Sequence, residues 1–573
     1  MDARILTAVK VGNFKAFADT QTIPLKPITL IFGPNSAGKS SFIHSLALAH
    51  EGLRTGKLDV FRTDIGGSAI DLGGFRQYVH KTERGRRVEW GAEINTANLA
   101  GPLAERLASV RRVSLSLLIG LEGEMDAESL LDELEGREHS PIYSGKEQEG
   151  AESRVVVMAY ELAADGILLT KMSRRRDGML RLDQLNREHA VFRRVLEAIV
   201  LSNTTTDRVT DADLQTLHTE VDRLVPEIQA KAERFLPEIF LPSGGKETLA
   251  ETLLRPVSRG TRAEDLAETV RLFFPRSVAE LVDGVNDLVR QEVGALTYLG
   301  PLRSFPPRHL AFTEHEDRNW YAGGGYAWDI VRQEMAVREV VNKWLSSPEL
   351  KTPYRLGVRS MFALDQMTDP LAKELGELVE NLDVVPDPGY EHGHSATIDD
   401  PDAAARSILQ EMRKSNVDRL TELVLVDQRT KTVVSHRDVG IGISQVLPVL
   451  VTAYASKNRI IAMEQPEIHL HPGLQAELGD VFIEGALGER RNTFILETHS
   501  EHLILRLLRR IRETASGELP VGAVPLKPED LAVIYVQAEQ AGSRVVQISV
   551  TAEGDFSGGW PEGFFAERAQ ELF

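Results

Sequence analysis

A loop of small residues near the N-terminus has the composition needed to bind phosphate. It matches the pattern G-x-x-x-x-G-K-[ST] and consists of Gly33, Pro34, Asn35, Ser36, Ala37, Gly38, Lys39 and Ser40, with Ser41 directly after it. Successive backbone N–H groups of such a loop wrap a phosphate, and the following helix directs its positive N-terminus at the same anion. We expect Lys39 to reach the β- and γ-phosphates of ATP and the Ser40 hydroxyl to ligate Mg²⁺.

A carboxylate at the end of a neighbouring strand would complete the metal shell of such a site. The apolar run Arg-Ile-Ile-Ala-Met ends at Glu464, so we expect this side chain near the Mg²⁺. Glu467, His469 and His471 follow and invite another reading, as ligands of a different metal ion. Residues at alternate positions lie on the same side of the chain only within a strand. The flanking prolines favour a turn instead, which argues against this metal site. Glu391, His392 and His394 could also be ligands of a metal ion. A solvated loop is the other interpretation of these residues.

A histidine follows the next apolar strand of the chain. Residues 493–496 form this strand, and Glu497, Thr498 and His499 come directly after it. The ring of His499 could hydrogen-bond a γ-phosphate or the water that attacks it. We therefore include His499 among the candidate catalytic residues.

A turn rich in glycine and serine opens a strongly apolar helix at residues 443–455. Small residues at a helix N-terminus can cradle an anion. The candidate contacts are Gly440, Gly442, Ser444 and Gln445. A plain glycine-rich turn explains the same residues, and the turn by itself leaves both interpretations open.

Strands and helices alternate around these motifs, as in proteins built on a parallel sheet. Near the N-terminus, β-rich runs cover residues 5–11 and 28–32, directly before the phosphate loop. Later runs lie at 423–426, 459–463, 493–496, 531–536 and 545–550. Together with the phosphate loop, this order predicts an α/β fold of the P-loop NTPase class, built on a sheet with parallel strands.

Residues 101–294 differ from the rest of the chain in composition and pattern. They are rich in charged residues, and their apolar residues mostly recur with the spacing of a helix. Residues 121–152 carry 11 acidic and 2 basic side chains, which is close to half of the net charge of −19. We predict a mainly helical insertion at 101–294. It would separate an N-terminal half of the ATPase domain at 1–100 from a C-terminal half at 295–573.

The order of these motifs resembles the ABC-type ATPases of the SMC/RecF/OLD group. The resemblance covers about residues 1–80 and 295–573, includes the opening Asn13-Phe14-Lys15-Ala16-Phe17, and leaves most of the insertion unmatched. The stretches EQPEIHLHP, YLGPLR and WPEGFF look still more like a bacterial branch of OLD-like ATPases. Many members of that branch belong to anti-phage defence or are uncharacterised, so the resemblance implies a role in such defence or in DNA maintenance.

The resemblance implies a role for each matched residue. Gly33–Ser41 would be the Walker A loop, Glu464 would replace the usual Walker B aspartate, and His499 would be the switch histidine. Gln77 falls where the Q-loop glutamine, a ligand of the Mg²⁺ shell, is expected, and His469–Pro472 would be the D-loop. The signature motif, which in this group touches ATP of a partner subunit, would consist of Gly440, Gly442, Ser444 and Gln445. The resemblance thus implies an α/β fold of the ABC-type P-loop NTPases, with a mixed sheet and flanking helices. It also implies an ATPase that dimerises around ATP.

One position departs from the pattern of this group. The acid that positions the attacking water usually follows the Walker B acid directly, and here that position is Gln465. Glutamine can orient water but cannot accept a proton. One hypothesis is slow hydrolysis with long-lived ATP-bound dimers. The other is that Glu467 supplies the missing carboxylate.

The composition excludes several other classes of protein. None of the 573 residues is cysteine, which rules out disulfide-stapled domains, cysteine zinc sites and a cysteine nucleophile. No apolar stretch is long enough to span a membrane, and the acidic residue at position 2 disfavours a signal peptide, so we expect a cytoplasmic protein.

The expected partners are a second copy of the chain and a separate effector protein such as a nuclease or toxin. A scaffold that holds ATP without hydrolysing it is the alternative function. An intrinsic nuclease is disfavoured, because the Asp-x-Asp spacing in the cluster of Asp399, Asp400 and Asp402 lies in an expected loop without a flanking apolar strand. Whether the protein contacts DNA stays open. Two basic groups could be either solvated faces or DNA-binding patches. They are Lys171, Arg174, Arg175, Arg176 and Arg181, and Lys81, Arg84, Arg86 and Arg87.

Overall fold

The chain divides into two compact units. The computed structural model describes residues 5–83, 85–122, 154–203, 209–240, 261–303, 318–346, 352–362, 383–386, 394–397, 419–434 and 441–558. The first unit comprises Met1–Ser304, Asp317–Gly324 and Thr452–Phe573, and the second comprises Phe305–Glu316 and Gly325–Val451. The predicted boundaries near residues 100 and 295 fall at neither junction and stay predictions.

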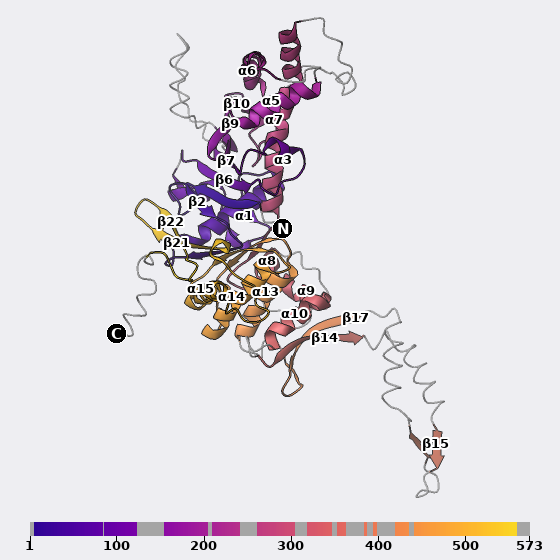
Figure 1. Cartoon of the computed structure of the whole chain (residues 1–573). Helices are drawn as coiled ribbons and strands as arrows, with labels where there is room; N and C mark the ends of the chain where they lie inside the picture. The colour runs from indigo at the N-terminus through magenta and orange to yellow at the C-terminus, as the bar shows by residue number, and fades with distance from the viewer. Residues whose placement is uncertain are drawn as a thin grey trace. The chain divides into compact units, whose positions relative to one another are not determined.

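A six-stranded sheet carries the phosphate loop (Figure 1). Its strand order is β13 (Leu296–Leu299), β19 (Ile460–Glu464), β20 (Thr493–Glu497), β3 (Ile28–Phe32), β21 (Leu531–Ala538) and β22 (Ser543–Ile548). The first five strands run parallel, and β22 pairs antiparallel with β21. Every residue of β3, β19 and β20 is buried, as expected for parallel strands covered on both faces. The predicted mixed α/β fold is therefore confirmed.

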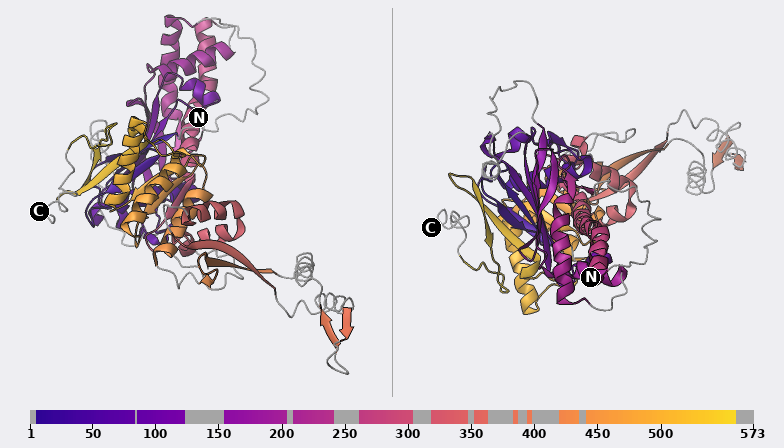
Figure 2. Two further views of the ribbon diagram at one scale, coloured as in Figure 1. Left: turned by 60° about the horizontal axis from the view of Figure 1, so that its bottom comes forward. Right: turned by 90° about the horizontal axis from the view of Figure 1, so that it is seen from above.

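Three helices follow the strands that carry the predicted motifs. They are α1 (Lys39–Thr55), α14 (Pro472–Leu487) and α15 (Glu501–Ser516). The helix α1 contacts β13 and β20, while α14 contacts β3 and β20 and packs along α15. Figure 2 shows the same elements in two further views.

A nine-stranded antiparallel sheet forms the other layer of the first unit. Its order is β12 (Ile239–Phe240), β11 (Gln229–Lys231), β10 (Met179–Leu185), β9 (Ile167–Arg174), β8 (Val155–Ala164), β7 (Arg112–Leu121), β6 (Val88–Asn95), β1 (Leu6–Gly12) and β2 (Gln21–Pro24). One hydrophobic core joins this sheet to α1 and to the six-stranded sheet, so the helix behind the phosphate loop is anchored to both layers.

The insertion at 101–294 contains the strands β7 to β12 as well as helices. The predicted helices are present as α5 (Ala190–Asn203), α6 (Asp211–Leu224) and α7 (Arg262–Gly294), which pack together. Our prediction of helix misses the six strands. Side chains of β7 alternate between buried and partly exposed with the period of two that favours a strand, but charged helical segments dominate the wider region.

Short elements complete the first unit. They are β4 (Arg62–Thr63), β5 (Gly67–Asp71), α2 (Phe75–Tyr78), η1 (His80–Thr82), α3 (Pro102–Arg106), η2 (Val225–Glu227), α8 (Arg318–Ala322) and η4 (Pro528–Asp530). The long helix α7 begins with a capping box in which Thr261 and Glu264 satisfy each other's backbone N–H groups.

The second unit contains a three-stranded sheet and several helices. The sheet has the order β14 (Tyr354–Phe362), β17 (Arg419–Asp427) and β18 (Val433–Val434), and β15 (Asp383–Pro386) pairs with β16 (His394–Thr397). The helices are α9 (Tyr326–Gln333), α10 (Met335–Ser346) and most of α13 (Ile441–Ala455). Across the described ranges of both units, no helix combines the length and apolarity needed to cross a bilayer.

Candidate functional site

The phosphate loop connects β3 to α1 through two glycines that no other residue could replace without strain. Gly33 has φ +146, and a Cβ there would lie 2.4 Å from the carbonyl oxygen of Val536. Gly38 has φ +92, and its Cβ would lie 2.2 Å from the Cβ of Ala16. Gly38 is the N-cap of α1 and makes no side-chain capping bond, so the first N–H groups of the helix remain available to an anion.

Lys39 is folded back onto its own loop. Its Nζ donates to the carbonyl oxygens of Gly33 at 3.0 Å and Pro34 at 2.9 Å, and the residue is only 4% exposed. Burial lowers the pKa of Lys39, while the nearby charges of Glu497 and Glu467 oppose the shift. Carbonyl dipoles compensate a buried ammonium less well than an anion does, so a phosphate would be a favourable partner here.

The hydroxyl of Ser40 is held by a carboxylate from the neighbouring strand. Ser40 Oγ donates to Glu497 Oε2 at 2.7 Å, and Glu497 pairs in register with Glu464 on β19. Glu464 was predicted from the sequence as an acid of the metal shell, whereas Glu497 was given no role. Its position at the end of an apolar strand, like that of Glu464, is the signal that could have identified it.

Glu464 lies in a largely buried setting. Its Oε1 accepts a hydrogen bond from the Tyr298 hydroxyl at 3.0 Å and lies 3.8 Å from Nε2 of His44. Burial and then the charge of Glu497 raise the pKa of Glu464 to about 7. Burial also raises the pKa of Glu497.

These residues fit the shell of a Mg²⁺ ion bound together with nucleotide. Two buried carboxylates at one level of neighbouring strands repel each other, and a divalent cation would relieve that repulsion. In the described part of the chain, no group of three or more His, Cys, Asp or Glu residues is arranged to hold a metal alone. Mg²⁺ usually takes one or two carboxylates and completes its shell with water and phosphate, which matches Ser40, Glu464 and Glu497.

Glu467 and His499 meet beside this shell. Oε1 of Glu467 accepts the backbone N–H of His499 at 2.8 Å. The other oxygen, Oε2, and Nε2 of His499 are both buried, and neither has a hydrogen-bond partner among the described residues. Burial raises the pKa of Glu467 and lowers that of His499, on which the charge of Lys39 acts in the same direction. Unsatisfied buried polar atoms are rare, and two together point to a missing water or ligand.

Gln465 has a constrained backbone between these groups. Its φ is +46, its N–H donates to the Glu497 carbonyl at 2.7 Å, and its carbonyl accepts from Arg303 Nη2 at 2.8 Å. A non-glycine residue in this region is strained and persists only where its surroundings hold it. The backbone of the residue directly after Glu464 is therefore fixed by contacts with β20 and Arg303.

The structure does not support a metal site at the two histidines of this segment. His469 and His471 are both exposed, and His471 is the N-cap of α14, where its Nδ1 accepts the N–H of Gly473 at 3.2 Å. Helix capping accounts for this ring. The alternative set of Glu391, His392 and His394 lies outside the residues whose side chains are described, as do Asp399, Asp400 and Asp402.

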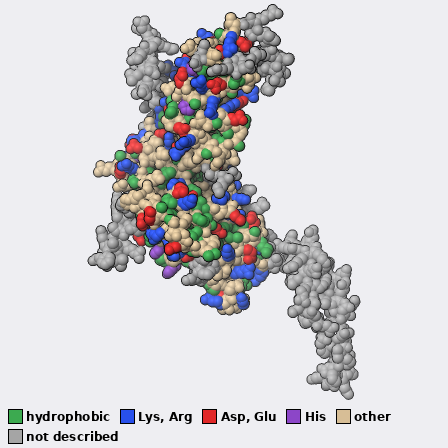
Figure 3. Space-filling view, viewed as in Figure 1, with side chains coloured by type: hydrophobic (Ala, Val, Ile, Leu, Met, Phe, Trp, Pro, Cys, Tyr) green, Lys and Arg blue, Asp and Glu red, His purple; other side chains and the backbone are tan. Residues whose placement is uncertain are grey.

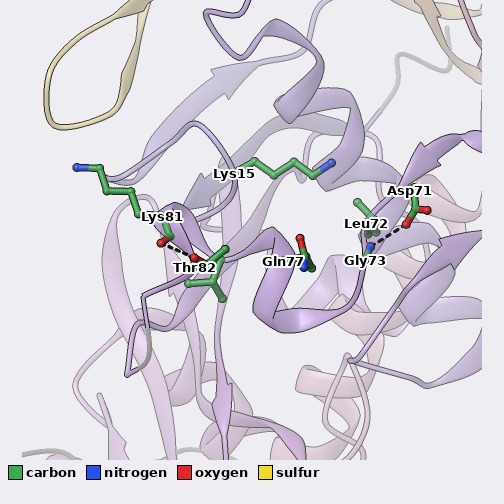
Figure 4. A pocket seen from close by; sticks show the side chains of 8 residues that line it. Lys15, Asp71, Leu72, Gly73, Gln77, Lys81 and Thr82 are labelled. Carbon is green, nitrogen blue, oxygen red and sulfur yellow. Dashed lines mark hydrogen bonds between the residues drawn. The ribbon is translucent and has the colours of Figure 1, made fainter.

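Gln77 lines a cavity that shares Lys15 with the cavity at the phosphate loop. A cavity of about 290 Å³ is lined by Lys15, Ser36, Lys39, Ser40, His44 and Glu497. A larger one of about 590 Å³ is lined by Lys15, Asp71, Gln77 and Lys81 among others (Figure 4). Gln77 lines only the larger cavity, and Lys15 lines both. The predicted contact of Gln77 with Mg²⁺ stays a prediction.

The predicted signature motif belongs to the second unit. Gly440 lies outside the described residues, while Gly442, Ser444 and Gln445 occupy the start of α13. Ser444 is 2% exposed and Gln445 is 5% exposed. Their predicted contact with ATP of a partner subunit stays a prediction.

The basic groups considered for DNA are largely paired with acids. Ion pairs join Lys171 to Glu161, Arg174 to Glu122, Arg175 to Asp183, Arg181 to Asp177, and Arg86 to Glu83. On the face drawn in Figure 3, basic and acidic side chains are interspersed. Arg84 and most of the acidic segment 121–152 lie outside the described residues. Local pairing weakens the case for DNA at these positions, because neutralised side chains attract phosphates less.

Comparisons with known proteins identify two ATPase regions. A family model described as an AAA ATPase domain matches residues 362–504, and one described as an AAA domain matches residues 8–115. All the predicted site residues lie inside these two regions. A search of curated proteins finds no match.

Solved structures similar to this chain include SMC head domains. One, an SMC head bound to the C-winged helix domain of ScpA, is 10% identical with a TM-score of 0.33, and the match covers 95% of this chain and 98% of that one. A Pyrococcus furiosus Smc head with an extended coiled coil, bound to the C-terminal domain of ScpA, has 10% identity, a TM-score of 0.32, and coverage of 99% and 98%. The SMC head of Thermotoga maritima has 8% identity, a TM-score of 0.31, and coverage of 95% and 100%.

The family matches and the loop geometry together define the class. The chain carries a P-loop nucleotide site of the ATPase type on a mixed α/β fold. Similarity to the solved structures is too low to specify an activity.

Proposed function

We propose that this protein binds ATP with Mg²⁺ at the loop Gly33–Ser41 and hydrolyses it. The observation that carries the proposal is the bond from Ser40 Oγ to Glu497 Oε2 at 2.7 Å, with Glu464 at the same level of the next strand. It brings the hydroxyl expected to bind Mg²⁺ together with two buried acids. The α1 N-terminus and Lys39 supply the phosphate-binding groups beside them.

Each side chain has a defined task in this proposal. Lys39 exchanges the carbonyl oxygens of its loop for phosphate oxygens. Ser40, Glu464 and Glu497 would hold a Mg²⁺ ion, which would supply neutralisation of phosphate charge. Gln77 is proposed as an additional group of the Mg²⁺ shell. His499, whose Nε2 lacks a hydrogen-bond partner within the described ranges, donates to the terminal phosphate or its water.

We assign the carboxylate that accepts the proton of the attacking water to Glu467. Its Oε2 has no hydrogen-bond partner in the described part of the chain, while Oε1 accepts the backbone N–H of His499. Gln465 would orient the same water without taking its proton. The burial of Glu467 raises its pKa, which makes it a better base than an exposed glutamate.

The second candidate function is an ATP-dependent scaffold that hydrolyses slowly or not at all. The specific observation in its favour is Gln465, whose backbone is fixed where this group of ATPases usually has its acid. Such a protein would remain ATP-bound for long periods and recruit a separate effector.

A homodimer is part of both candidates. In it, Gly440, Gly442, Ser444 and Gln445 would contact ATP held by the other subunit, so that ATP closes the dimer. We further propose that closing and opening control a partner protein, with roles in anti-phage defence or DNA maintenance as the resemblance suggests. DNA itself is a weaker candidate partner, given the ion pairs of the basic groups.

Calorimetric titration with ATP and Mg²⁺ tests the binding step. The wild-type chain should bind ATP, and Lys39→Ala should weaken binding by about 100-fold, since a charged hydrogen-bonding partner is removed from a phosphate. Lys57→Ala, an exposed lysine just beyond α1, is the matched control and should bind as the wild type does. Equal binding by Lys39→Ala and wild type would exclude this loop as the ATP site.

A further inference from the structure

Lys15 reaches the nucleotide site from outside the phosphate loop. It lies in the connection between β1 and β2 and lines the 290 Å³ cavity together with Lys39, Ser40 and His44. It also lines the 590 Å³ cavity that contains Gln77. Figure 4 shows its side chain extended across the larger cavity, with the ammonium toward the wall that carries Asp71. Lys15 is thus the lysine that both cavities share.

The backbone of Lys15 is held in an unusual conformation. Its φ is +46, although it is not a glycine. Its N–H donates to the Tyr78 carbonyl at 2.7 Å, and its own carbonyl lies 2.8 Å from Nδ1 of His80. Strained positions of this kind persist where the surrounding structure fixes them, and they are concentrated at functional sites.

The ammonium of Lys15 is positioned by a neutral partner. Nζ lies 2.7 Å from Nδ1 of His44, and an ammonium can only donate, so Nδ1 is the acceptor and the ring proton is on Nε2. Nε2 is the atom that lies 3.8 Å from Glu464 Oε1. His44 is four residues after Ser40 on α1, which places both side chains on the same face of the helix.

The charge of Lys15 has no direct counter-ion among the described residues. No carboxylate oxygen there lies within 4.0 Å of its Nζ, although Asp71 and Glu464 act on it from farther away. A half-buried ammonium fixed by a neutral imidazole, at the wall of a phosphate-binding cavity, is arranged to receive an anion.

We propose that Lys15 is a second cationic residue of the nucleotide site, binding a phosphate oxygen of ATP, and that His44 is the positioning residue that holds its ammonium there. The inference rests on the proposed binding of ATP at Gly33–Ser41. It adds a contact that the phosphate-loop motif does not contain, and it links the segment of Gln77 to the phosphates through the bond between Lys15 and Tyr78.

Calorimetric titration of the full chain with ATP and Mg²⁺ tests this proposal. Lys15→Met should weaken ATP binding by about 10- to 100-fold, the usual value of a charge-assisted hydrogen bond. It should also reduce the salt dependence of ATP affinity, because one cation fewer contacts the anion. Lys15→Arg should restore part of the affinity. Lys81→Met is the matched control, since Lys81 lines only the larger cavity and in Figure 4 points away from Lys15.

A double-mutant cycle tests the part played by His44. His44→Ala should weaken ATP binding in the wild-type background and have little further effect in Lys15→Met, because the two residues act as one unit. If His44→Ala weakened ATP binding as much in Lys15→Met as in the wild type, so that the two effects added, the role of His44 would be overturned. ATP binding by a folded Lys15→Met protein equal to that of wild type would overturn the role of Lys15. Wild-type protein that binds no ATP would instead overturn the proposed function.

Discussion

The hydroxyl of Ser40 donates a hydrogen bond to Oε2 of Glu497 at 2.7 Å, joining the first turn of α1 to the end of β20. The pair places a carboxylate next to the hydroxyl expected to bind Mg²⁺, one strand away from Glu464. The proposed Mg²⁺ shell therefore contains two acids. The acid adjacent to the phosphate-loop strand is Glu497.

Glu497→Gln should weaken the binding of Mg²⁺ and ATP together. An amide keeps the shape and can still bond Ser40, but it loses the charge that attracts the cation. We expect the Mg²⁺ concentration required for half-maximal ATP binding to rise by about 10-fold or more. Titration of Mg²⁺ at fixed ATP measures it. Glu539→Gln, outside the metal shell, is the control, and an unchanged Mg²⁺ requirement in Glu497→Gln would exclude this acid.

Gly38→Ala should disrupt the phosphate loop more than a glycine change elsewhere. The added Cβ would lie 2.2 Å from that of Ala16, at φ +92. Strain and overpacking should together lower the free energy of unfolding by about 2–4 kcal/mol and abolish ATP binding. Urea denaturation and calorimetry measure the two effects.

The matched control is Gly56→Ala at the C-terminus of α1. Gly56 also has positive φ, at +75, but its Cβ would meet nothing nearer than 4.0 Å. Gly56→Ala should lower the free energy of unfolding by about 1 kcal/mol, from backbone strain alone, and leave ATP binding intact. Equal losses at both glycines would show that close packing of the phosphate loop contributes nothing.

Glu467→Gln should reduce ATP turnover by about 100-fold or more while leaving ATP affinity nearly unchanged, as expected when a general base is removed. Phosphate release under steady-state conditions measures turnover. Gln465→Asn, which shortens the water-orienting side chain, should have a smaller effect. Turnover by Glu467→Gln close to wild type would instead favour slow hydrolysis organised by Gln465.

The stability of the metal-free protein should fall as pH rises through neutrality. The pKa of Glu464 is raised to about 7 in the folded chain, above the ordinary glutamate value, so the folded state binds more protons than the unfolded state between these values. Glu464 therefore favours folding at low pH and loses that contribution as pH rises through about 7, by about 3 kcal/mol in all. Urea denaturation in EDTA across this range measures it.

Glu464→Gln should remove this part of the pH dependence. The amide carries no titrating proton, so its stability curve should be flatter between pH about 5 and 8 than that of wild type. Glu539→Gln should keep the wild-type curve. A Glu464→Gln protein with the same slope as wild type would show that other groups cause the pH dependence.

The phosphate loop and the strands around it could be predicted from sequence because their signals are local. Glycines at Gly33 and Gly38, an apolar strand before them and an apolar helix after them all lie within one short segment. The acid at Glu464 and the histidine at His499 follow apolar strands in the same way.

Other parts of the site depend on contacts between distant segments. Lys15 meets His44, and Tyr298 meets Glu464 across 166 residues of sequence. No spacing rule connects such pairs, so only the folded chain reveals them. The strands β7 to β12 were missed for a related reason, since a sheet is specified by pairing between strands rather than by one segment.

Steady-state phosphate release from ATP by the purified full-length chain, compared between wild type and Lys39→Ala, tests the central claim most directly. We predict Mg²⁺-dependent turnover by the wild type that Lys39→Ala abolishes and the Lys57→Ala control retains. Turnover that persists in Lys39→Ala, or ATP binding by the wild type without any turnover, would contradict hydrolysis at this site.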